Sequence, residues 1–279
     1  MITPSEEDYI KNYAYVPEHI TGYVIAVSQG EPLLLGDYLC YDRKGYLIFV
    51  GYPLNKPFEE KEMNKILDTA IERFKPDHIA LIAPAFSISR EIYYRSESDC
   101  YYKLDLSKLH VHQKLRNMIK RASRELYIER KQELRNEHIQ LISEFLNTHK
   151  VDEATQYIFE RIPEYVSSVP TAEVFSARDK AGRLVAFDVA EFSAKDYAFY
   201  MFNFMSQHGS VPGVSDLLLY EVIRTAQEQR KSFINLGLGI NEGVTFFKKK
   251  WGGVPFLHYE FCLYHPKYKR RLKSLYEKL

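Results

Sequence analysis

The order of helix-like and strand-like segments constrains the fold of this chain more than any other feature. After residue 107, hydrophobic spacing predicts a helix, a strand, two helices, three strands, a helix, a strand, a helix and a strand pair. These segments are 112–126, 126–134, 136–150, 151–162, 171–179, 183–193, 197–206, 214–229, 232–239, 241–251 and 256–265. Tight turns join the three consecutive strands, so the order predicts an antiparallel meander in an α+β fold with a mixed sheet.

The first 107 residues repeat part of this order. The patterns predict three strands, a helix and two more strands, at 21–28, 32–42, 45–53, 56–74, 77–85 and 100–106. A length of 279 residues suits two modest domains. We therefore expect two related lobes, an abbreviated one at 1–107 and a fuller one at 108–279 that carries the active cleft.

Composition excludes several classes of protein. Three widely spaced cysteines form no C-x-x-C pair, which argues against a disulfide framework or a zinc ribbon. We see no secretory signal pattern and no apolar stretch of about 18 residues, so we expect a cytoplasmic protein. Aromatic residues make up 14% of the chain, including 22 tyrosines, and most of them are expected in the core.

The net charge of +1 conceals two basic segments. Residues 108–131 hold eight lysines and arginines against two glutamates, and residues 246–279 hold nine against two. Such segments in an acidic body suggest a local anionic ligand, although two solvated helix faces would give the same pattern.

A glycine-containing loop precedes the strongest predicted helix. Glycine at position 213 would let the backbone approach a pyrophosphate, which amide N–H groups and the positive helix end can bind. This loop and the order of elements resemble the GNAT acyltransferase superfamily. The resemblance implies that acyl-CoA, by default acetyl-CoA, contacts Val211, Gly213, Val214 and Ser215. The loop departs from the family pattern at Ser210, where a cation is usual, and at Pro212, which lacks an N–H.

A second signature follows the strand at 232–239. Asn241, Val244, Phe247 and Gly252 match the spacing of the GNAT pattern in this region, and Lys248 stands at its tyrosine position. The resemblance implies that Asn241 helps to bind the cofactor. It also makes Lys248 a candidate proton donor to the leaving group, because an ammonium can replace the phenol in that role.

Two further stretches are similar to the Fem-type, two-lobe branch of this superfamily. They are the glycine- and lysine-rich segment 234–253 and the basic helix 112–126. The branch includes aminoacyltransferases that use aminoacyl-tRNA, and the catalytic region of lysyl-phosphatidylglycerol synthase has the same plan. The resemblance implies tRNA as a partner and a small-molecule or peptide amine as acceptor.

Polar residues that interrupt apolar strands are the candidate catalytic groups. Asp188, Asn203 and Asn235 each do so, and an inward carboxylate needs a partner or a use. Asp188 is a candidate base if it points inward, but it would be a simple surface residue if it points outward; the two asparagines could equally satisfy core hydrogen bonds. By position in the fold, the oxyanion donor would be a backbone N–H of Phe204, Met205 or Ser206.

Other polar groups have weaker claims. Arg116, Lys120 and Arg124 could hold a phosphate or form a solvated helix face. His208 could act as an acid or base, or be a plain loop residue, and Glu242 could polarise an amine or cap a helix. The basic stretch 267–278 could dock on an anionic membrane.

We find no metal-binding set, P-loop or dinucleotide motif in the sequence. We therefore expect acyl or aminoacyl transfer to an amine by direct attack, without a metal or a covalent intermediate. The alternative is a non-catalytic GNAT-like binding module with a degenerate cofactor loop.

Overall fold

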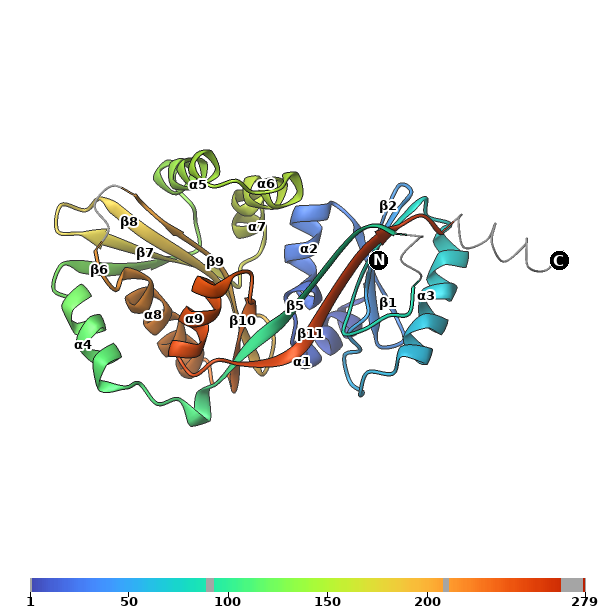
Figure 1. The fold of residues 1–279 in the computed structure, drawn as a ribbon, viewed down its shortest axis with the longest axis horizontal. Coiled ribbons are helices and arrows are strands. Elements are labelled where there is room, and N and C mark those ends of the chain that lie inside the picture. Colours follow the sequence, from blue (N-terminus) through green and yellow to red (C-terminus); the bar gives the residue numbers. More distant parts are fainter. Residues whose placement is uncertain (1, 89–92, 208–210, 267–277, 279) are drawn as a thin grey trace.

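One continuous eleven-stranded sheet runs through both halves of the molecule (Figure 1). The computed structural model describes residues 2–88, 93–207, 211–266 and 278. The strand order is β1-β2-β3-β4-β11-β5-β10-β9-β8-β7-β6. The predicted α+β class with a mixed sheet and flanking helices is confirmed.

The described residues of the N-terminal half form five strands and three α-helices. The helices are α1 (Pro4–Tyr13), α2 (Thr21–Ser28) and α3 (Glu60–Phe74), with a short 3₁₀ turn η1 (Pro17–His19). The strands are β1 (Glu31–Leu35), β2 (Tyr38–Arg43), β3 (Tyr46–Val50), β4 (His78–Ala83) and β5 (Tyr93–Asp105). Apolar residues Met63, Leu67 and Ala70 recur along α3 at helical spacing, and they bury that face against the sheet.

The second half begins with η2 (Leu106–Lys108) and carries the predicted meander. Its helices are α4 (Gln113–Ala122), α5 (Asn136–Thr148), α6 (Glu153–Glu160), α7 (Ile162–Ser168), α8 (Val214–Glu228) and α9 (Glu242–Lys250). Its strands are β6 (Leu126–Lys131), β7 (Ala172–Asp179), β8 (Leu184–Glu191), β9 (Tyr197–Met205), β10 (Phe233–Leu238) and β11 (Val254–Tyr264). Strands β6 to β9 pair antiparallel in sequence order.

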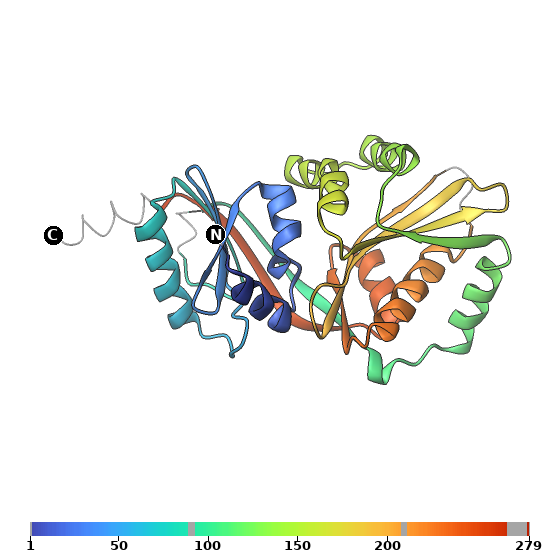
Figure 2. The same ribbon diagram turned by 180° about the vertical axis from the view of Figure 1, so that it is seen from behind.

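Two long strands connect the halves. Strand β11 pairs antiparallel with β5 over most of its length and with β4 at its end, while β5 also pairs with β10. In both views these two strands cross the middle of the molecule side by side (Figures 1 and 2). Strand β11 of the second half therefore pairs with two strands of the N-terminal half.

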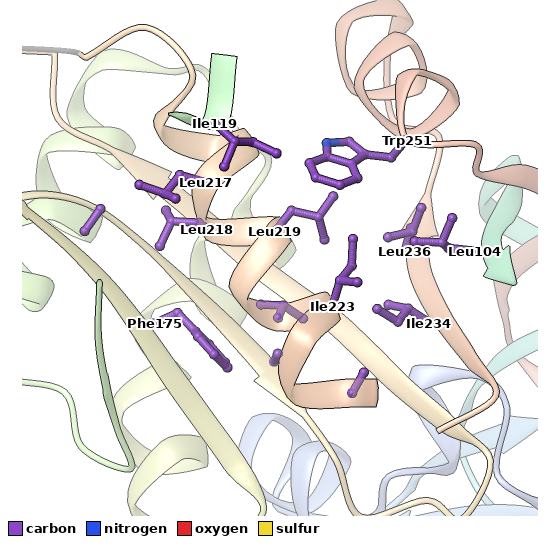
Figure 3. Packing of buried hydrophobic residues seen from close by; sticks show 14 of the residues in the cluster. Leu104, Ile119, Phe175, Leu217, Leu218, Leu219, Ile223, Ile234, Leu236 and Trp251 are labelled. Atoms are coloured by element: carbon purple, nitrogen blue, oxygen red, sulfur yellow. The ribbon is translucent and has the colours of Figure 1, made fainter. Parts of the chain in front are cut away.

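The core of the second half lies between the sheet and helices α4, α8 and α9 (Figure 3). Leu219 and Ile223 of α8 face Ile234 and Leu236 of β10, and Trp251 packs above them. A second core on the opposite face, beneath α5 and α7, contains Phe187, Val189 and Phe204.

Three predicted elements of secondary structure are wrong. Residues 21–28 form helix α2 rather than a strand; the helix lies against α7, and both Val24 and Ala26 are buried. Residues 32–42 form a hairpin, β1 to β2, that turns at Gly36 with φ +60°. Residues 256–265 belong to the single strand β11 rather than a strand pair, because its partners are β4 and β5.

Candidate functional site

Strands β9 and β10 separate after a short parallel contact. Their pairing covers three residue pairs and ends at Phe199 with Asn235, although β9 continues to Met205. Gly237 has φ +77° and forms a bulge, after which Leu238 pairs with Tyr101 of β5. The edge of β9 beyond Phe199 is therefore open toward the end of β10.

The side chain of Asn235 hydrogen-bonds to backbone groups at the point where the pairing of β9 with β10 ends. The side chain is fully buried; its Oδ1 accepts from the Gly237 N–H at 2.8 Å, and its Nδ2 donates to the carbonyl of Tyr15 at 2.8 Å. Its amide thus satisfies two backbone groups and ties β10 to the segment after α1. The predicted catalytic role of Asn235 stays a prediction, and its observed contacts are structural.

Asp99 holds the turn that follows β10. Its carboxylate accepts from the N–H of Gly239 at 3.2 Å and from the N–H of Ile240 at 2.8 Å. Ile240 has φ +60°, a strained backbone for a β-branched residue, and its side chain is 74% exposed. The turn is therefore held in one conformation directly before α9.

Lys248 of α9 reaches this separation point from the side of α8. The residue is 4% exposed, and its ammonium donates to the carbonyl of Leu238. Burial lowers the pKa of Lys248 to about 7, against the opposing effect of Asp99. A Cβ atom on Gly237 would lie 3.6 Å from Nζ of Lys248 and 3.8 Å from the carbonyl oxygen of Tyr200. The ammonium therefore stands at the mouth of the gap between β9 and β10.

Asp188 points inward, toward α8. The side chain is fully buried, and its Oδ1 accepts from Nδ2 of Asn203 at 2.6 Å. Asp188 and Asn203 oppose each other in the β8–β9 ladder, whereas Phe187 and Val189 face the other core. Burial raises the pKa of Asp188 to about 8, so at pH 7 most of the carboxyl carries a proton.

Tyr200 completes this polar cluster and is not among the residues predicted from sequence. A bulge at Met201 places Tyr200 opposite Ala190, on the same face of the sheet as Asp188. Among the described residues, neither the Tyr200 hydroxyl nor Oδ2 of Asp188 has a hydrogen-bond partner of normal geometry. The bulge, which sequence does not reveal, is what turns this tyrosine inward.

The three candidate oxyanion donors on β9 differ in direction. The Ser206 N–H donates to the carbonyl of Val185 at 2.8 Å. Because antiparallel pairs alternate, Phe204 also directs its N–H toward β8, whereas Met205 directs its N–H away from β8, toward the gap. The Phe204 ring itself packs against Phe187 at 5.2 Å. Met205 is therefore the best placed of the three.

The predicted phosphate loop is partly described. Gly213 has φ +87° directly before α8, and a Cβ there would lie 2.7 Å from Cγ of Met118 on α4. The Val214 N–H donates to the carbonyl of Val211 at 3.1 Å, and the Ser215 hydroxyl donates to the Met205 sulfur at 3.0 Å. The positive φ angle and the close approach of Met118 both require a glycine at position 213. Ser210 and His208 lie outside the described residues.

Asp216 fixes the start of α8 to the end of α9. Its buried Oδ1 accepts from Nζ of Lys250 at 2.6 Å and from Nε1 of Trp251 at 3.0 Å. This carboxylate lies in the first turn of α8, where its negative charge interacts favourably with the positive end of the helix dipole. The two helices that flank the gap are therefore held together.

Comparison with known proteins now identifies the architecture. No protein-family model matches the chain, and no curated protein matches it. Three similar solved structures are L-PGS from Bacillus licheniformis, FemX, and a tandem GNAT protein from the clavulanic acid biosynthesis pathway. Their identities are 15%, 12% and 10%, with TM-scores of 0.58, 0.60 and 0.58. The alignments cover 94%, 93% and 93% of this chain, and 92%, 96% and 93% of those chains.

The chain has a Fem-like, two-lobe GNAT fold. The predicted resemblance is thus confirmed at the level of fold. In this GNAT fold, β9 and β10 are the strands that separate, and the loop before α8 lies beside them.

The predicted anion-binding residues are all exposed. Arg116 donates from Nε to the carbonyl of Val111 at 2.7 Å, while Lys120 and Arg124 point to solvent. Within α4, Met118 is the residue that contacts Gly213.

Two other cations of α4 have a better position relative to α8. Lys114 and Arg121 are also exposed, and they lie four residues before and three residues after Met118. This spacing puts them beside Met118 on one face of the helix, whereas Arg116 and Lys120 lie on the far side. Lys114 and Arg121 therefore flank the loop before α8, and the sequence analysis did not select them.

Asn241 and its neighbours form the N-terminus of α9. The Asn241 side chain accepts from the Val244 N–H at 2.9 Å and so caps the helix, and Glu242 is exposed in the first turn. Cofactor binding by Asn241 stays a prediction. The basic stretch 267–278 lies outside the described residues except at its last position.

Cavities and metal sites do not add candidates near the gap. A cavity of about 460 Å³ lies on the N-terminal half, and one of about 750 Å³ lies between that half and residues 168–171 and Ser193 of the second half; no predicted site residue lines either of them. In the described part of the chain, no group of His, Cys, Asp or Glu side chains is arranged to bind a metal ion. Within residues 2–88, 93–207 and 211–266, no helix combines the length and apolar character needed to cross a bilayer.

Proposed function

We propose that this chain is an acyltransferase that moves an acyl or aminoacyl group to an amine in the gap between β9 and β10. The observation that carries the proposal is Lys248, a buried ammonium whose pKa is lowered to about 7 at the point where the two strands separate. A buried lysine with a pKa near the operating pH is suited to proton transfer.

The proposed step is direct attack. The amine nitrogen forms a bond to the acyl carbon, and the carbon–sulfur or carbon–oxygen bond to the donor breaks. Lys248 gives a proton to the leaving group, Asp188 in its ionised form accepts a proton from the amine, and the Met205 N–H stabilises the oxyanion. Asn203 orients Asp188 through its 2.6 Å hydrogen bond.

Two donor classes fit this proposal. Acyl-CoA is supported by Gly213 and the start of α8, which suit a pyrophosphate. Aminoacyl-tRNA is supported by the exposed cations along α4, for which no ion pair is seen among the described residues. A small-molecule or peptide amine is the proposed acceptor.

Calorimetric titration tests the donor. Acetyl-CoA and bulk aminoacylated tRNA are titrated separately into the protein, with deacylated tRNA as a control. We expect one donor to bind, and binding of tRNA should weaken steeply between about 50 and about 200 mM salt. If neither donor binds at millimolar acetyl-CoA or micromolar tRNA, the proposal fails.

A non-catalytic binding module is the second candidate. It is favoured by the bonds that Asn235, Asn241 and Lys248 make to backbone groups, because a purely structural role would produce the same bonds. A measurement of turnover distinguishes an acyltransferase from a non-catalytic binding module. The protein is incubated with the donor that binds and a mixture of primary amines, and mass spectrometry follows donor loss. An enzyme forms amide products at a rate that Lys248→Met lowers about 100-fold, whereas a module forms none.

The remaining expectations stay proposals. They are a boundary near residue 107, a cytoplasmic location, and contact between residues 267–278 and an anionic membrane.

A further inference from the structure

A dense group of tyrosines lies where the N-terminal half meets the shared strands. The rings of Tyr101 and Tyr259 are 5.6 Å apart, and those of Tyr101 and Tyr52 are 5.9 Å apart. Tyr23 packs against three separate clusters of buried hydrophobic residues. Its ring centroid lies 5.3 Å from that of Tyr165 and 6.2 Å from that of Phe202 on β9. This group accounts for part of the tyrosine excess in the sequence.

Glu18 places a carboxylate inside this group. Both of its carboxylate oxygens lie 2.8 Å from the hydroxyl of Tyr101, and the Tyr41 hydroxyl donates to its main-chain carbonyl at 2.9 Å. Among the described residues, no lysine, arginine or histidine forms an ion pair with Glu18. The adjacent His19 is no partner, because its Nε2 contacts the carbonyl of Tyr52 and burial lowers its pKa to about 4.

A carboxylate in this setting is costly to keep without a cation. Burial raises the pKa of Glu18, and a single phenol is its only hydrogen-bonding side chain among the described residues. Glu18 and Tyr23 are nevertheless only half-buried, so the cluster keeps some contact with solvent. Aromatic faces around a carboxylate attract an ammonium group through both the ion pair and cation–π contacts.

Glu18 lies close to the proposed reaction centre but on the other face of the sheet. Its partner Tyr101 pairs with Leu238, the residue whose carbonyl accepts from Lys248. The bulge at Gly237 turns Leu238 toward the buried group that contains Tyr101. Leu236, in contrast, faces the hydrophobic core beneath α8. Lys248 and Glu18 therefore approach the end of β10 from opposite faces.

We infer that Glu18, Tyr101 and Tyr23 form a binding site for a primary ammonium group, the cationic form of the acceptor amine. The identity of this group as the acceptor rests on the proposed function, but binding of an ammonium does not. The amine would then pass from the face of α2 through the gap between β9 and β10 and meet the donor, Lys248 and Asp188 on the face of α8.

The test is a titration of the whole protein, without donor, by n-butylammonium chloride, followed by tyrosine signals in near-UV circular dichroism. The neutral 1-butanol and the trimethylated n-butyltrimethylammonium are matched probes. Glu18→Gln keeps an acceptor for the Tyr101 hydroxyl but removes the charge. Glu72→Gln, an exposed change on α3, is the control variant.

We expect n-butylammonium to bind the parent protein and Glu72→Gln equally and Glu18→Gln at least tenfold more weakly, with no saturable binding of 1-butanol. Equal affinity for the parent and Glu18→Gln, or no binding of n-butylammonium at about 100 mM, overturns the inference. If the parent protein binds n-butylammonium but transfers no acyl group to any amine, the proposed function fails and this binding site stands.

A second measurement guards against misfolding. Because the folded protein keeps a poorly compensated carboxylate, Glu18→Gln should unfold at the same or a higher temperature than the parent at pH 7.5. A clearly lower unfolding temperature would mean that Glu18 stabilises the fold, and it would contradict a site maintained for a ligand.

Discussion

Asn203 and Asp188 are joined side chain to side chain across β8 and β9, with Nδ2 of the asparagine 2.6 Å from Oδ1 of the aspartate. Ser206 and Val185 share a backbone hydrogen bond in the same ladder, and alternation makes Asn203 and Asp188 a non-hydrogen-bonded pair. Side chains of such pairs approach most closely, which explains the short contact. The aspartate is buried, so this contact has consequences for stability and for the proposed proton transfer.

Asp188→Asn should change the pH dependence of stability. The pKa of Asp188 is about 8 in the folded protein and about 4 in an unfolded chain, so the folded state binds the extra proton between these values. The contribution of Asp188 to stability is therefore full below about pH 4 and falls by about 1.4 kcal/mol per pH unit up to about pH 8. Urea unfolding at pH 5 to 9 should show this decline in the parent protein and lose it in Asp188→Asn. The exposed change Asp8→Asn is the control, and parallel curves for parent and Asp188→Asn would contradict the raised pKa.

Lys248→Met should reduce kcat about 100-fold, the usual contribution of one general acid. Lys248 gives a proton only while it is charged, and that fraction falls as pH rises through about 7. Asp188 accepts a proton only while it is ionised, and that fraction rises with pH through about 8. The kcat/KM of the parent should therefore be highest between about pH 7 and about pH 8 and decline at higher pH, and this alkaline limb should vanish in Lys248→Met. Lys249→Met changes the exposed neighbour and should keep both rate and profile. A profile that keeps its alkaline limb without Lys248 would assign the proton to another group.

Gly213→Ala should destabilise the protein by about 1–3 kcal/mol, because φ +87° is strained for alanine and the new methyl meets Met118. Urea unfolding of a double-mutant cycle with Met118→Ala separates the two causes. The double variant should recover the part due to the clash and keep the part due to backbone conformation. Strict additivity of the two changes would mean that the Met118 contact contributes nothing.

Neutralising Lys114 and Arg121 together should weaken binding of an anionic donor about tenfold, since both flank the loop before α8. Neutralising Arg116 and Lys120 removes the same charge from the far side of α4 and should weaken binding less than about threefold in 0.15 M salt. Titration calorimetry at fixed salt measures both variants. The reverse order of effects would return the role to the residues predicted from sequence.

Asn235→Ala should cost about 2–4 kcal/mol, because the change leaves the Gly237 N–H and the Tyr15 carbonyl without partners in a buried site. Urea unfolding measures the loss. Asn203→Ala is a useful comparison, since its partner Asp188 is already mostly protonated at pH 7 and a smaller loss is expected. A loss below about 0.5 kcal/mol for Asn235→Ala would contradict the structural role.

Most of the second half of the fold was predictable because most of its elements have a clear hydrophobic pattern. Helix α8 and strands β7 to β9 show amphipathic or apolar repeats of the expected length. Helix α2 was not predictable in this way, because its β-branched residues are apolar on all sides and it lies between α7 and the N-terminal sheet. Its partners, not its own pattern, determine that it is helical.

The candidate site also contains some residues that could be predicted from the sequence and others that could not. Lys248 and Gly213 could be found because loop and helix spacing resembles a known family. Tyr200 and Glu18 could not, since a bulge at Met201 turns the first inward and a long-range contact with Tyr101 gives the second its environment. Lys114 and Arg121 were overlooked because only the contact between Met118 and Gly213 shows which side of α4 faces α8.

The pairing of β11 with β4 also determines when the first lobe can be completed during synthesis. Strand β4 has β3 on one side and β11 on the other, so its second edge stays open until the ribosome has released residue 264. An open edge of this kind can pair with the wrong chain. The sheet of the nascent N-terminal half is therefore completed only after the second half has been made.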